Sequence, residues 1–210
     1  EALGDLCHDD GRCPDREVVE TWIGLDCRAY LSVVLDLWSL ESIGSKDGES
    51  SLLEGLLADR ARSHADQIFG LLELIHDPRE IRAARRGIEG QRANLRAHAL
   101  EFLDNVLQGD LRQQVFVALD DLPRAERLRQ AKRLYDLEPE STEAVLERLA
   151  TERLPGDADS PWITAAALWL IVEAGLDSLY PMLRRVAERD DDPLVQETTA
   201  VLVARLGATP

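Results

Sequence analysis

Six arginines near the middle of the chain form its strongest cluster of residues able to bind a ligand: Arg79, Arg82, Arg85, Arg86, Arg92 and Arg96. Arg79, Arg82 and Arg86 are three and four residues apart, so they share one face of a helix. The guanidinium group is a planar fork of donors that suits carboxylates and phosphates. Such a cluster could bind a carboxylate-rich helix, a phosphate or an anionic lipid headgroup. The alternative is a solvated face whose charge balances the acidic flanks of the same molecule.

The charge of the chain is unevenly distributed. The 210 residues have a formal net charge of −16. Residues 79–133 nevertheless contain 12 Lys and Arg against 8 Asp and Glu, a net charge of +4, between flanks of −11 and −9. A general nucleic-acid-binding protein needs a basic surface that displaces counterions from phosphates, so the overall charge argues against that function. We expect a protein partner instead, with acidic character.

The cysteines indicate a reducing compartment. Cys7, Cys13 and Cys27 make an odd number, which does not suit a secreted disulfide framework, so reduced cytoplasmic thiols are the simplest explanation. These cysteines and His8 could be drawn as a zinc site, but the spacing between Cys7 and Cys13 is wider than in a zinc knuckle. We expect buried free cysteine, no metal and no cofactor.

Other polar residues do not form a recognisable catalytic set. His64 and Asp66 are two positions apart and face different sides of a helix, and His76 and His98 have no partner at metal-ligand spacing. Asp190–Asp192 lacks the spaced ligands of a calcium loop and suits a turn with an N-cap. No HExxH, GxSxG, P-loop or GxGxxG motif occurs. The sequence predicts a non-enzymatic protein, although a site assembled from distant residues would carry no motif.

A recurring helical pattern must position these residues. In QRANLRAHALEFLDNVLQ (91–108), one helical face carries Leu95, Ala99, Phe102 and Val106. Ala99, the small residue in the middle of this face, should let a second helix come close. The pattern returns at Ile163, Ala167 and Leu170, and again at Val195, Thr199 and Leu202. The last two copies are 32 residues apart, and the first lies about two such units earlier, which is typical of a helical solenoid.

About nine helices and no strand are expected. We predict a tail or loop at 1–15, a helical repeat domain at 16–206 with a lobe break at 154–161, and a tail at 207–210. Proline and capping residues predict helix starts at Asp77-Pro78, Ser141-Thr142 and Asp192-Pro193. Trp22 and Trp38 are expected to fill the core, and Gly109 to close the helix of residues 91–108.

No segment of the chain is long enough to span a membrane. The longest uncharged run, SPWITAAALWLIV, has 13 residues, whereas a span needs about 20. The chain opens on Glu1 and shows no signal-peptide pattern, so we expect a cytoplasmic chain that is a fragment of a longer protein.

The C-terminal turn and helix resemble the HEAT-repeat family. Asp192, Pro193, Val195, Glu197 and Leu202 match its pattern in place, with Thr199 where alanine is usual. The segment 71–122 is also similar to the HEAT-repeat region of bacterial membrane proteins related to ATP/ADP carriers. These resemblances imply a right-handed α-solenoid of irregular HEAT-like helix pairs, whose extended curved surface would bind partners or arrange neighbouring domains.

Three functions remain open from the sequence. The preferred one is a non-enzymatic protein-interaction or regulatory scaffold that is a soluble part of a larger protein. The second is a cytoplasmic regulatory domain attached to a nucleotide-transporter-like membrane protein. The third is a HEAT-like enzyme, of which a DNA-directed member would conflict with the acidic charge.

Overall fold

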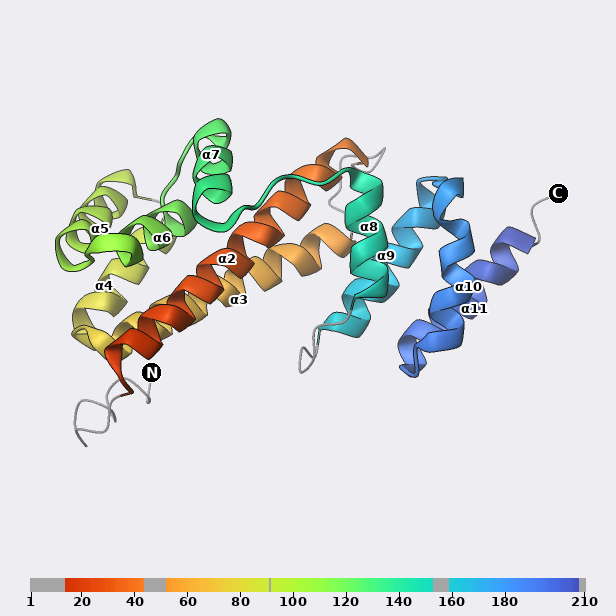
Figure 1. Cartoon of the computed structure of the whole chain (residues 1–210), viewed down its shortest axis with the longest axis horizontal. Helices are drawn as coiled ribbons and strands as arrows, with labels where there is room; N and C mark the ends of the chain where they lie inside the picture. Colours follow the sequence, from red (N-terminus) through yellow and green to blue (C-terminus); the bar gives the residue numbers. More distant parts are fainter. Residues whose placement is uncertain (1–13, 44–51, 91, 153–158, 208–210) are drawn as a thin grey trace. The chain divides into compact units, whose positions relative to one another are not determined.

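The computed structural model describes residues 14–43, 52–90, 92–152 and 159–207 (Figure 1). Ten α-helices and two short 3-10 helices account for most of these residues, and the described part contains no strand. The all-α prediction is therefore confirmed. The described residues form ten α-helices, against about nine expected from the sequence.

The helices follow one another as α2 (Arg16–Leu40), α3 (Leu52–Ile75), α4 (Pro78–Glu89), α5 (Ala93–Val106), α6 (Gly109–Leu119), α7 (Arg124–Tyr135), α8 (Thr142–Thr151), α9 (Ser160–Glu173), α10 (Tyr180–Arg189) and α11 (Pro193–Gly207). The 3-10 helices are η1 (Glu41–Ile43) and η2 (Asp177–Leu179). None of the helices in the described ranges combines the length and the apolar character that crossing a bilayer requires.

The chain divides into two compact units. Unit 1 consists of residues 1–33 and 60–138, and unit 2 of residues 34–59 and 139–210. The division falls inside α2 and α3, so each of these long helices contributes to both units. The expected lobe break at 154–161 and the expected tails lie mostly outside the described residues.

Three predicted helix starts have the expected capping geometry. Side-chain oxygens of Asp77, Ser141 and Asp192 accept hydrogen bonds from the backbone N–H groups of Arg79 (2.8 Å), Ala144 (3.2 Å) and Leu194 (2.9 Å), respectively. Such caps satisfy N–H groups that have no partner within the helix. The prediction for Gly109 is wrong, because α5 ends at Val106 and Gly109 begins α6 with a φ of 57°.

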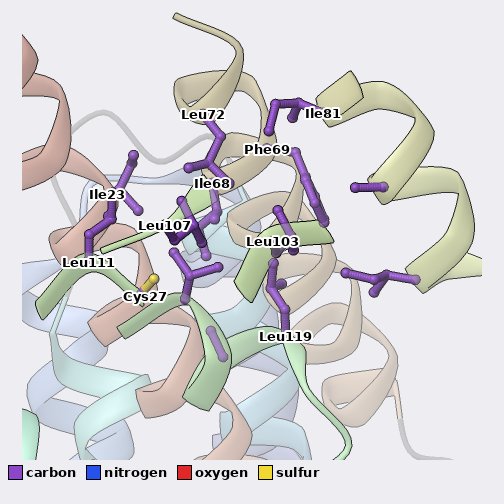
Figure 2. Close-up of a cluster of buried hydrophobic side chains, with 14 of the residues drawn as sticks. Ile23, Cys27, Ile68, Phe69, Leu72, Ile81, Leu103, Leu107, Leu111 and Leu119 are labelled. Carbon is purple, nitrogen blue, oxygen red and sulfur yellow. The ribbon is translucent and has the colours of Figure 1, made fainter. Parts of the chain in front are cut away.

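The core of unit 1 is a cluster of apolar side chains from helices α2 to α6 (Figure 2). Val19, Ile23 and Cys27 of α2 are fully buried, as their apolar character and their spacing of four residues predict. Burial of each large aliphatic side chain stabilises the fold by about 1.5–3 kcal/mol. The prediction that Trp22 fills the core is wrong: it lies on another face of α2 and is 44% exposed.

Helices α4 and α5 form an antiparallel hairpin with a very close contact. A Cβ atom added to Gly87 would lie 2.8 Å from the Cβ atom of Ala99 and 2.8 Å from the carbonyl oxygen of Leu95. Ala99 is buried, so the prediction of a close helix contact at this alanine is confirmed. The buried face of α5 is rotated from the expected stripe, because Leu103 is buried whereas Leu95 is 44% exposed.

Unit 2 contains helices α8 to α11 together with parts of α2 and α3. α9 packs against both α8 and α11, and α10 packs against α11. Eight of the 14 residues of α9 are buried, as its nearly uncharged sequence predicts. Thr199 of α11 is also fully buried, and its hydroxyl donates a hydrogen bond to the carbonyl oxygen of Val195 at 2.8 Å.

Candidate functional site

The structure separates the six predicted arginines into two groups of three. Arg82, Arg85 and Arg96 bond to groups within unit 1. On α4, an Nη atom of Arg82 lies 2.9 Å from a carboxylate oxygen of Glu73. Arg85 contacts Asp66 at 2.5 Å and Glu89 at 2.7 Å, and its hydrogen bond to Glu89 raises its pKa. These two side chains therefore fasten α4 to α3.

Arg96 connects three helices through backbone oxygens. Its two terminal nitrogens donate hydrogen bonds of 2.8 Å to the carbonyl oxygens of Ile88 in α4 and Leu119 in α6. Both carbonyls lie in the last turn of their helices, where no intrahelical donor is available. A positive charge is also favourable at the negative end of a helix dipole. Arg96 thus has a structural explanation that the sequence pattern could not show.

Arg79, Arg86 and Arg92 are the arginines of the cluster that remain exposed. Within the described ranges, no ion pair is recorded for any of the three. Arg79 and Arg86 lie two turns apart on the same side of α4, and Arg92 precedes the first turn of α5. These side chains can reach a partner without first breaking a bond inside unit 1.

A groove of about 430 Å³ lies between α4 and α5, and Arg86 is one of its lining residues. Ala83 and Gly87 of α4 and Leu95, Ala99 and Phe102 of α5 supply its apolar surface. The groove exists because small side chains on α4 leave room beside the larger Leu95 and Phe102. We call it the α4–α5 groove. Sequence reasoning missed it, although the spacing of Ala83, Ala84 and Gly87 indicates a face of small residues.

The ends of the groove differ in charge. Glu80 and His98 also line it, and His98 lies 3.9 Å from Glu101. Near Leu95, the first turn of α5 contains no acidic residue, and the N-cap residue Arg92 makes no side-chain capping bond. This helix end therefore keeps its partial positive charge and could accept a carboxylate from outside the chain.

The described residues contain no group of three or more His, Cys, Asp or Glu side chains that could hold a metal ion. Cys7, His8 and Cys13, the other members of the zinc hypothesis, lie outside the described residues. Cys27 is buried in the unit 1 core, where desolvation above all raises the pKa of its thiol far above the usual range, and Asp26 raises it further. A thiol held in this protonated form is a poor nucleophile.

A contact between His64 and Asp26 was not expected from the sequence. Nδ1 of His64 lies 3.0 Å from a carboxylate oxygen of Asp26, and both side chains are mostly buried. The two residues are 38 positions apart, so no local spacing could indicate their contact. This pair joins α3 to α2, whereas Asp66, the neighbour considered in the sequence, bonds to Arg85.

The proteins available for comparison share no detectable similarity with this chain: no family model, curated protein or solved structure matches it.

Proposed function

We propose that the protein is a non-enzymatic protein-interaction or regulatory scaffold, acting as a soluble cytoplasmic part of a larger protein. The observation that carries this proposal is the apolar α4–α5 groove lined by Arg86, with Arg79 exposed on the same side of α4 and Arg92 exposed at the start of α5. Interaction surfaces of proteins typically combine an apolar centre with polar residues at the edge, and arginine is enriched in them.

The architecture that we propose for this scaffold is a right-handed HEAT-like α-solenoid. Support comes from unit 2, where the α8–α9 and α10–α11 pairs follow each other and α9 packs against α11. Of the recurrent positions in this unit, Leu170 is partly buried and the others are buried: Ile163, Ala167, Val195, Thr199 and Leu202. Stacked helix pairs of this kind form their core between neighbouring repeats and expose long surfaces for partners.

The buried carboxylates favour a scaffold over an enzyme. Asp36 and Glu73 are the buried acidic side chains of the described part. Asp36 lies 2.5 Å from Arg148 in unit 2, and Glu73 pairs with Arg82 in unit 1. Both carboxylates are thus engaged by arginines of the same unit, and we interpret them as groups that hold helices together.

The test is affinity capture from a lysate of the source organism, followed by quantitative mass spectrometry. The baits are the wild type, Arg79→Glu/Arg86→Glu, and the control Arg28→Glu/Arg184→Glu, which alters the charge equally at exposed arginines that do not line the groove. We expect one protein to be enriched on the wild type and the control and lost from the first variant. Identical captures on all three baits, or no capture, would contradict the proposal. Circular dichroism checks that each variant is folded.

A regulatory domain of a nucleotide-transporter-like membrane protein is the second candidate, and it rests on the sequence pattern of residues 71–122 alone. Sequencing the gene on both sides of this segment distinguishes the two. A multi-span hydrophobic region in the same reading frame would support this candidate, and its absence would leave the separate scaffold.

A further inference from the structure

Building on the proposed interaction function, we propose that the α4–α5 groove binds an acidic amphipathic helix of a partner protein. The bound helix would place apolar side chains on the groove floor and carboxylates against Arg79, Arg86 and Arg92. Three features of unit 1 support this occupant: the shape of the groove, its length and its charge.

The shape of the groove suits a helix better than an extended peptide. Both walls are α-helices, whose backbone groups are bonded internally, so they offer no free edge to which a β-strand could pair. The floor is small and apolar at Ala83, Gly87 and Ala99, with Leu95 and Phe102 standing beside it. Side chains of a third helix can fill such a depression in the way that ridges fit grooves between packed helices.

The length of the groove matches a helical ligand with three anchors. Its lining residues extend from Glu80 to Gly87 on α4 and from Leu95 to Phe102 on α5. Seven residues of α-helix correspond to about 10 Å. Anchors at positions i, i+3 or i+4, and i+7 of a bound helix span the same distance. A phosphate or a single lipid headgroup would leave this apolar length uncovered.

The charge around the groove favours an acidic ligand, with the three exposed arginines outnumbering Glu80, the acidic residue of its lining. Arg86 lines the groove, Arg79 lies on the same side of α4, and Arg92 stands at the uncapped start of α5. Residues 79–133 carry a net charge of +4 in a chain of −16. An acidic helix would be attracted to this segment, whereas a basic helix would be repelled here and drawn to the acidic flanks.

The experiment uses the full chain and a display library of helical peptides about four turns long. Three anchor positions vary among Leu, Ile, Met and Phe, and the flanking positions are either Asp/Glu or Lys/Arg. Bound peptides are then measured by fluorescence anisotropy against three proteins: the wild type, Ala83→Trp and Ala97→Trp. Ala83 lines the groove, whereas Ala97 is an exposed alanine of α5 outside its lining, so the second variant controls for the added indole.

We expect enrichment of acidic peptides, with Ala83→Trp weakening their binding at least tenfold and Ala97→Trp leaving it unchanged. Arg79→Glu/Arg86→Glu should weaken binding by about tenfold at low salt, and less at high salt, because exposed charges are screened. Enrichment of basic peptides, enrichment of none, or equal binding to both Trp variants would overturn the inference. Self-association of the wild type that Ala83→Trp abolishes would assign the groove to a second copy and overturn it too.

The outcomes separate this inference from the proposed function. If lysate capture depends on Arg79 and Arg86 but no acidic peptide is enriched, the scaffold stands and the helical ligand is wrong. If an acidic peptide binds through Ala83 but no cellular protein is captured, the groove is a helix-binding site and the scaffold function fails.

Discussion

Arg96 and Arg92 are neighbours in sequence with opposite roles in the structure. Arg96 donates to the carbonyl oxygens of Ile88 and Leu119, whereas Arg92 is exposed. We expect Arg96→Ala to lower the free energy of unfolding by about 1–3 kcal/mol, since it leaves two helix-end carbonyls without their donor. Arg92→Ala should change it by no more than about 0.5 kcal/mol. Urea unfolding measures both, and equal effects would contradict the structural role of Arg96.

His76 should make stability depend on pH near neutrality. Desolvation lowers its pKa below the ordinary 6.5, and Arg16 lowers it further, against an opposite effect of Glu20. Because the unfolded state then binds the proton more readily, the contribution of His76 is complete above pH 6.5. It is lost as the pH falls from there through the folded pKa.

The check is urea unfolding at several pH values between about 7.5 and 5.5, a range that brackets the ordinary pKa of histidine. The wild type should lose more stability than His76→Gln over this interval. The same slope in the wild type and His76→Gln would show that His76 does not contribute.

Among the elements, the α4–α5 hairpin gives the sharpest packing prediction. Gly87→Ala should destabilise by about 1–3 kcal/mol, because its Cβ atom would overlap Ala99 and the carbonyl of Leu95. Gly70→Ala in α3 is the matched control, since nothing lies within 4 Å of its added Cβ atom. That change should stabilise the helix by about 0.5–1 kcal/mol. Urea unfolding measures both changes. If Gly87→Ala raises the free energy of unfolding as Gly70→Ala does, α4 and α5 are farther apart than the structure shows.

The other side of this contact can be tested independently. Ala99→Leu should overpack the hairpin and destabilise it by about 1–3 kcal/mol. An unchanged thermal midpoint would mean that residue 99 faces solvent. Ala97→Leu, at an exposed position of the same helix, supplies the control and should have little effect.

Helix positions and caps were predictable because their causes are local. Asp77-Pro78 and Asp192-Pro193 fix helix starts within a few residues, and apolar spacing identified Val19, Ile23 and Cys27 as core. The orientation of α5 about its axis was not predictable, because Leu95 and Leu103 are equally apolar and only their neighbours decide which is buried. The prediction likewise placed all six arginines in one cluster. In the structure, three of them bond to carboxylates or carbonyl oxygens whose positions depend on the tertiary fold.

At the scale of the whole molecule, the net charge of −16 should make stability depend on salt. Like charges repel in the compact state, and added salt screens that repulsion. We expect the thermal midpoint to rise from low salt to about 0.3 M NaCl, by about 2–4 °C for each 1 kcal/mol regained. Arg79→Glu/Arg86→Glu replaces two positive charges by two negative ones, which shifts the net charge from −16 to −20, and this variant should show a larger rise. A midpoint that falls with salt would show that attractive ion pairs dominate.

The course of the chain through its two units determines how the gene can be divided. Because unit 1 takes residues 1–33 and 60–138, it is not one uninterrupted stretch of polypeptide. A clone of residues 60–138 would lack Val19, Ile23 and Cys27, which belong to the same core as Ile68 and Leu72. Neither unit can therefore be expressed, transplanted or duplicated as a simple exon-like cassette, and deletion mapping of binding will mislead wherever a cut separates α2 from α3.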